Sequence, residues 1–129
     1  MIKIISISIV TVSVLFSSLV FAGGHTKGMY IHIINFNITG IDRSQYEGGA
    51  MQATSAFAAV PGLIRKHWLA NEENNTYGGV YIFDSKESHD AFTESELYAG
   101  VKGNPSFTNF SGKSFENIDS LAKHTRGTE

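Results

Sequence analysis

The residues best suited to chemistry are Lys66 and Trp68, which stand two positions apart in an expected strand. Because side chains alternate along a strand, both lie on one face of the sheet. A cation beside an indole can hold a flat ligand that is anionic or phenolic. The pair also has a purely structural interpretation, in which a lysine extends at a sheet edge over a packed tryptophan. The residues alone leave both interpretations open.

An aromatic strand follows a short loop, and Tyr81 and Phe83 share one of its faces with Gly79. Tyr81 can orient a ligand or donate a proton, or it can simply seal the sheet. The glycine leaves room for another group to approach the backbone. Asn35, in an earlier strand, can hydrogen-bond a ligand carbonyl or mark the end of that strand. The candidate ligand-binding residues are therefore Lys66, Trp68, Tyr81, Asn35 and Phe83, and no residue is assigned a catalytic role.

A second kind of chemistry depends on how the chain begins after processing. Cleavage after Ala22 leaves Gly23, Gly24 and His25 at the amino terminus. A free amine, two amide nitrogens and an imidazole can then surround Cu(II) or Ni(II) in a plane. The alternative is a tail whose histidine has no role. The other histidines show no ligand spacing, so we expect no metal cage within the domain, and no cofactor.

Residues 1–22 have the pattern of a secretory signal peptide. Lys3 supplies the positive start, and no charged residue follows until after Ala22. Val20 and Ala22 are small residues at the positions that a signal peptidase reads. The alternative is a retained membrane anchor, because the apolar stretch is close to the shortest spanning length. We favour cleavage and export to the periplasm or beyond, with no membrane association afterwards.

The remaining chain has the size and composition of one compact domain. The whole sequence has 129 residues, no cysteine and a formal net charge of -2, so neither disulfides nor a nucleic-acid partner is expected. We expect a short tail at 23–28, a domain at 29–118 and a polar tail at 119–129.

The order of elements is strand, helix, strand, strand, helix, strand. A strand at 29–38 precedes a helix that a capping box of Asp42 and Gln45 begins, and that Pro61-Gly62 ends. Within this helix, Gly48-Gly49 indicates close packing or local mobility. A hairpin spans 63–84, and Asp84 or Ser85 caps the next helix, with His89 and Phe92 on its inward face. Asn104-Pro105 then precedes a last strand at 107–118.

This order is the ferredoxin-like βαββαβ plan, an α+β fold with an antiparallel four-stranded sheet. Helices on one face leave the other face bare, and we expect Trp68, Tyr81 and Phe83 on that bare face. Soluble monomers avoid such an apolar patch, so the pattern predicts a homodimer that covers it and encloses a cavity for a small molecule.

The sequence resembles the YdhR-like monooxygenases, a family of the dimeric α/β-barrel group, from about Met29 to Gly127. The resemblance lies in Phe36-Asn37, the run 57–63, Lys66 and Trp68, the run 77–83, Ser95-Glu96-Leu97, Asn104-Pro105 and Thr125-Arg126-Gly127. It implies two ferredoxin-like sheets that face one another across a dimer, with a cavity in each subunit.

The resemblance also implies a cofactor-independent monooxygenase that acts on a small aromatic or phenolic molecule. In that interpretation Lys66 stabilises the substrate anion, Trp68 stacks on it, and Asn35 or Tyr81 orients it. The alternative is a non-enzymatic exported protein of the same fold that binds a small molecule, haem or copper. Some relatives in this fold group bind haem through a helix histidine, and here only His89 is suitably placed.

Overall fold

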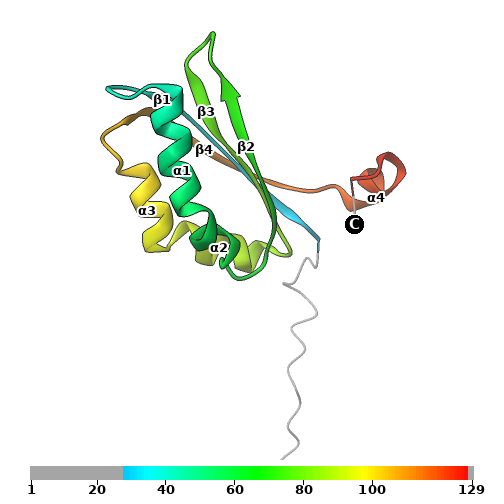
Figure 1. Ribbon diagram of the computed structural model, residues 1–129. Helices are drawn as coiled ribbons and strands as arrows, with labels where there is room; N and C mark the ends of the chain where they lie inside the picture. The colour runs from blue at the N-terminus through cyan, green and yellow to red at the C-terminus, as the bar shows by residue number, and fades with distance from the viewer. Residues whose placement is uncertain (1–27, 128–129) are drawn as a thin grey trace, which may run out of the picture.

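The computed structural model describes residues 28–127, and Figure 1 shows their arrangement. The signal peptide, almost all of the tail and the Gly23-Gly24-His25 site lie outside the described residues, so these expectations stay predictions. The elements in chain order are β1 (Tyr30–Ile38), α1 (Arg43–Ala58), β2 (Leu63–Asn71), β3 (Thr76–Phe83), α2 (Lys86–Thr93), α3 (Glu96–Lys102), β4 (Phe107–Glu116), α4 (Asp119–Ala122) and the 3-10 turn η1 (Lys123–Thr125). No helix among residues 28–127 is long and apolar enough to cross a membrane.

The four strands form one antiparallel sheet in the order β2-β3-β1-β4. Helices α1, α2 and α3 lie over the same face of this sheet (Figure 1). The ferredoxin-like plan is therefore confirmed, with β1 and β3 in the centre and β2 and β4 at the edges. The two central strands carry most of the buried core, including Ile34, Phe36, Tyr77 and Tyr81.

Each of the three longer helices begins at a polar cap that the sequence supplies. Asp42 accepts from the backbone of Gln45 while the Gln45 side chain accepts from Asp42, which completes the expected capping box of α1. Of the two candidates for α2, Ser85 is the cap, since its hydroxyl accepts from the Ser88 backbone. Ser95 caps α3 in the same way. These caps fix where the helices start above the sheet.

The prediction that Trp68, Tyr81 and Phe83 lie on the bare face is wrong. Tyr81 is 2% exposed and its ring contacts Phe57 of α1 and Phe92 of α2, so this side of β3 faces the helices. Alternation separates the two faces of a strand but does not state which one the helices cover. The open face carries the aliphatic alternates instead, namely Ile31, Ile33, Val80 and Ile82, with Phe115 at the β4 edge.

A glycine allows the central strands to approach each other closely. Gly78 lies opposite Asn35 in the β1–β3 ladder and has a φ of +156°. A Cβ built there would collide with the carbonyl oxygen of Ile34. Only glycine fits this position, because any side chain would push the two central strands apart.

The sequence suggested that residues 119–129 are simply a polar tail, but these residues contain regular structure. They form α4 and η1, which stand away from the helices and sheet (Figure 1). Ile118 and Leu121 are 62% and 64% exposed there.

Candidate functional site

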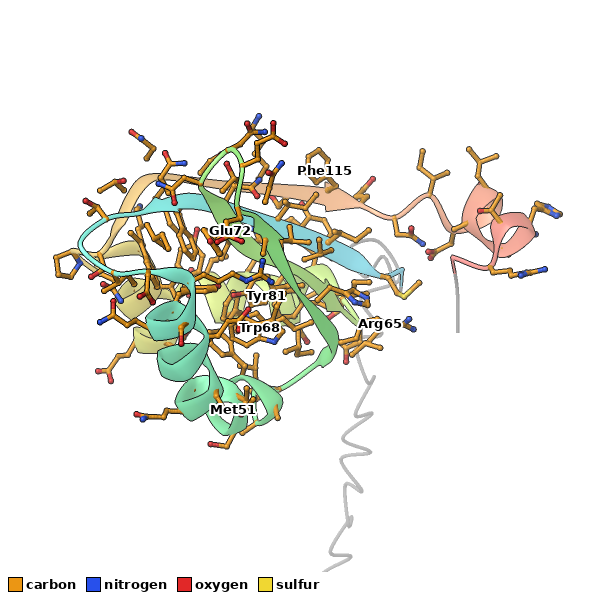
Figure 2. The ribbon with its side chains drawn as sticks, turned by 45° about the horizontal axis from the view of Figure 1, so that its top comes forward. Met51, Arg65, Trp68, Glu72, Tyr81 and Phe115 are labelled. Carbon is orange, nitrogen blue, oxygen red and sulfur yellow. The ribbon has the colours of Figure 1, made fainter. Side chains whose placement is uncertain are left out.

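A cavity of about 410 Å³ lies between α1, α3 and the helix-covered face of the sheet. It is therefore lined by elements of one chain, and its walls are mostly apolar. Lys66, Trp68 and Tyr81 line it from the sheet. Figure 2 shows Trp68 and Tyr81 on the helix side of the sheet and Phe115 on the other side. The helix residues that line it include Gln45, Tyr46, Phe57, Glu96 and Leu97.

The amino group of Lys66 lies within a cage of aromatic rings. Its Nζ is 3.1 Å from the Trp68 ring centroid, 3.4 Å from that of Phe57 and 4.7 Å from that of Tyr81. The cage depends on Gly79, since a Cβ there would lie 3.0 Å from Lys66 Cε and 3.0 Å from Tyr81 Cε2. The sequence-based expectation that a glycine in this strand admits another group is confirmed, and the group is the lysine side chain.

The surroundings of Lys66 disfavour its protonated, positively charged form. Desolvation by burial lowers the pKa of Lys66 from 10.5 to about 7. Among the described residues, no carboxylate forms an ion pair with this lysine. The ring faces attract a cation and so offset part of the desolvation. At neutral pH the amine is therefore able both to accept a proton and to carry a positive charge.

Phenolic hydroxyls complete the polar groups beside the cage. Burial raises the pKa of Tyr46 to about 12 and raises that of Tyr81 further, so both keep their protons at neutral pH. Neither hydroxyl has a hydrogen-bond partner among residues 28–127, although both side chains line the cavity. They can therefore donate hydrogen bonds to a ligand.

Two of the five candidate residues lie outside the cavity lining. Asn35 lies on the open face, between Gly78 and Ser111 in the ladder, and so cannot orient a ligand in this cavity. Phe83 is fully buried and packs under α2 on His89 and Phe92. The other three candidates, Lys66, Trp68 and Tyr81, lie together on the cavity wall.

Sequence reasoning missed the helix-side wall. Phe57 of α1 covers the amine of Lys66, and the sequence assigned it no place beside the ligand. Gln45 was expected only as a capping residue, but it lines the cavity as well. Glu96, at the start of α3, is the only carboxylate in the lining. Helical spacing could indicate which residues face inward, but not how far α1 stands from the sheet.

The buried histidines form a chain of their own away from the cavity. His89 Nδ1 lies 2.8 Å from Asp90 Oδ1, and His89 Nε2 lies 3.0 Å from His32 Nδ1. With both nitrogens engaged, and with no histidine in the cavity lining, His89 does not offer a ligand for a haem iron in the cavity. No group of His, Cys, Asp or Glu within the described part of the chain has a metal-binding arrangement.

Comparison with known families assigns this chain to one family. The family described as "Putative mono-oxygenase ydhR" matches residues 31–128. This chain belongs to the YdhR family. Comparison with curated proteins by sequence found no match. Family membership establishes a relationship to monooxygenases, and the reaction and the substrate are not part of it.

Solved structures show that this member of the YdhR family has the dimeric α/β-barrel fold. NE2512 of Nitrosomonas europaea, a protein of unknown function, aligns with a TM-score of 0.60 and 12% identity over 71% of this chain and 91% of that chain. SnoaB of Streptomyces nogalater, a cofactor-independent oxygenase, aligns with a TM-score of 0.57 and 14% identity over 70% of this chain and 94% of that chain. MhuD of Mycobacterium tuberculosis, a haem degrader, aligns with a TM-score of 0.56 and 20% identity over 69% of this chain and 95% of that chain. At these identities the likeness concerns the fold alone.

Proposed function

We propose that this protein is a cofactor-independent monooxygenase that oxidises a small, electron-rich phenol in the cavity under α1 and α3. One observation carries the proposal: the amine of Lys66 lies in an aromatic cage on the cavity wall without a carboxylate partner. SnoaB, a cofactor-independent oxygenase of the same fold, supports this reaction class. In the proposed complex, Lys66 takes the phenolic proton and the resulting ammonium stabilises the phenolate.

The reaction needs no external reductant. The phenolate passes an electron to O2, and the radicals recombine at the ring carbon opposite the oxygen. Loss of water then leaves a quinone, so that one oxygen atom enters the product and the other leaves as water. The substrate supplies all the electrons, while the apolar walls keep bulk water from the intermediates.

The electron-rich ring of the substrate also fits the rest of the lining. Trp68 offers an indole for stacking, and the Tyr81 hydroxyl can donate a hydrogen bond to the phenolate oxygen. Among residues 28–127, the Lys66 ammonium is then the only cation in the cavity lining, which contains no other lysine or arginine from this part of the chain. Neutral and anionic aromatics are therefore favoured over cations.

Oxygen uptake with a panel of electron-rich phenols that carry hydrogen on the ring carbon opposite the hydroxyl group tests the proposal. We expect consumption of O2 in step with quinone formation, and a loss of kcat of about 100-fold in Lys66→Met, since a positioned acid or base contributes on that order. Lys102→Met, at the exposed end of α3, is the matched control and should keep its activity. Saturable phenol binding with no O2 uptake would overturn the enzymatic assignment and favour the non-enzymatic binding protein.

We also propose that two copies pair through the open sheet face. Ile31, Ile33, Val80 and Ile82 form an aliphatic surface there, and Phe115 is 46% exposed beside it. Such a surface is unfavourable in water, and a second copy would cover it without closing the cavity on the other side of the sheet.

Export remains a proposal that rests on residues 1–22. Mass spectrometry of protein purified from its own host should find Gly23 as the first residue. A chain that begins at Met1 would contradict cleavage and, with it, the copper site at Gly23-Gly24-His25.

A further inference from the structure

The same lysine has a second chemical property, which the oxygenase proposal does not use. A neutral amine is a nucleophile toward carbonyl carbon, and an ammonium is not. Lys66 is half-buried among the rings of Phe57, Trp68 and Tyr81, and within residues 28–127 it forms no ion pair with a carboxylate. Burial lowers the pKa of this amine to about 7, so a large fraction is neutral under physiological conditions.

Another lysine of the chain is held in the opposite state. Lys86 Nζ lies 2.6 Å from Asp90 Oδ2 on the surface of α2, and this hydrogen bond raises the pKa of Lys86. An ammonium that a carboxylate stabilises is a poor nucleophile. The chain therefore contains a reactive amine on a cavity wall and an unreactive one on its surface.

We propose that Lys66 captures small aromatic aldehydes as a Schiff base within the cavity. The lining selects the class of carbonyl compound: the rings of the cage favour a flat aromatic body, and about 410 Å³ admits one small molecule. This activity goes beyond oxygenation, because it needs neither a phenolic hydroxyl nor O2.

The step balances without any oxidant or reductant. The lone pair of Lys66 Nζ forms a bond to the carbonyl carbon, and the π electrons move to the oxygen. One proton passes from nitrogen to that oxygen to give a carbinolamine. The hydroxyl group then leaves as water, with a second proton from the nitrogen, and a carbon–nitrogen double bond remains. Amine and aldehyde thus give imine and water, which the apolar cavity favours by excluding water.

Reductive trapping with benzaldehyde tests this inference. The protein is incubated under nitrogen at about pH 7.5 with limiting benzaldehyde and cyanoborohydride, and the modified lysines are found by peptide mapping. We expect Lys66 to carry the benzyl group at least about tenfold faster than Lys86, since one pKa unit changes the neutral fraction tenfold. Labelling spread evenly over the surface lysines would overturn the inference.

Two controls separate a reactive cavity amine from a merely exposed one. Lys86→Met should keep the labelling at Lys66, whereas Lys66→Met should lose the fast phase. In the wild-type protein, added benzyl alcohol, which has the same ring as benzaldehyde but no carbonyl group, should slow labelling at Lys66 by competing for the cavity and leave the surface lysines unchanged. Labelling of Lys66 that benzyl alcohol does not slow would contradict capture within the cavity. Benzaldehyde has no phenolic group and O2 is absent, so these results do not depend on whether the protein is an oxygenase.

Discussion

At the scale of single residues, the burial of Lys66 carries a cost in stability. Its pKa is about 7 in the folded chain and 10.5 in the unfolded chain, so the unfolded chain binds more protons between these values. Stability therefore rises as the pH increases from 7 to 10.5. Active-site groups held in unfavourable surroundings commonly carry such a cost.

Replacement of this lysine by an apolar side chain should stabilise the protein. For Lys66→Met we expect a gain of about 1 to 2 kcal/mol in the free energy of unfolding at pH 7, after discounting for the lost ring contacts. The gain should shrink as the pH approaches 10.5. Urea unfolding of both proteins at several pH values measures it. A variant that is less stable than wild type at pH 7 would show that the ring contacts outweigh the desolvation.

His32 predicts a separate sensitivity to acid. It is 4% exposed, its Nε2 has no hydrogen-bond partner, and burial together with the nearby His89 lowers its pKa to about 4. Between pH 6.5 and 4 the unfolded chain binds the extra proton, so stability falls as the pH decreases, by up to about 1.4 kcal/mol per pH unit.

Thermal unfolding at a series of pH values checks this loss. The stability of His32→Leu should depend less on pH than that of wild type across the same range, because the titrating group is gone. Tyr98 and Asp90 also face this histidine pair, so Asp90→Asn serves as the comparison that keeps His32 in place. An unchanged pH dependence in His32→Leu would assign the acid sensitivity to other groups.

At the scale of elements, we expect α1 to be a mobile wall of the cavity. Its two glycines were expected to indicate close packing or mobility, and a Cβ built at Gly48 or Gly49 meets no atom within 4 Å. Close packing is therefore excluded as the reason for them. Only Tyr46 and Phe57 of this helix are buried, one toward each end, so the glycines lie in a section with few contacts to the sheet.

Gly48→Ala should make this helix more rigid. Because the position is helical and unobstructed, we expect a gain in stability of about 0.5 to 1 kcal/mol. If ligands enter past α1, the same change should slow the association of a phenol, measured by stopped-flow quenching of Trp68, while the affinity changes little. Faster association, or a loss of stability, would contradict the assignment of α1 as the mobile wall.

At the scale of the whole molecule, the two faces of the sheet have different surfaces. The helix-covered face forms the cavity, and the open face carries the aliphatic surface that we propose as the dimer interface. We expect Val80→Glu, in the middle of the open face, to convert a dimer to a folded monomer, because two opposed carboxylates would be buried in the interface. Sedimentation velocity at several concentrations measures this. Thr54→Glu, at an exposed position of α1, is the control and should leave the association unchanged.

The sequence alone determined the order of the four strands and the helices between them, but not α4 and η1 at the end of the chain. Capping residues, the Asn-rich hairpin loop and the two-residue alternation are local signals, and local signals suffice to place α1, the β2–β3 hairpin and the pairing of Lys66 with Trp68 on one face. Tyr81 lies opposite Lys66 on the same face of the hairpin, because the loop between the two strands sets their register.

Only the tertiary structure decided which face of the sheet the helices cover. It placed Tyr81 and Phe83 inside, left Asn35 on the open face, and brought Phe57 over the amine of Lys66. It also joined His32 to His89 across 57 positions of sequence. Both faces of the central strands are apolar, so alternation could not choose between them. The choice depends on how the aromatic side chains fill the space between sheet and helices, which is a property of packing in three dimensions.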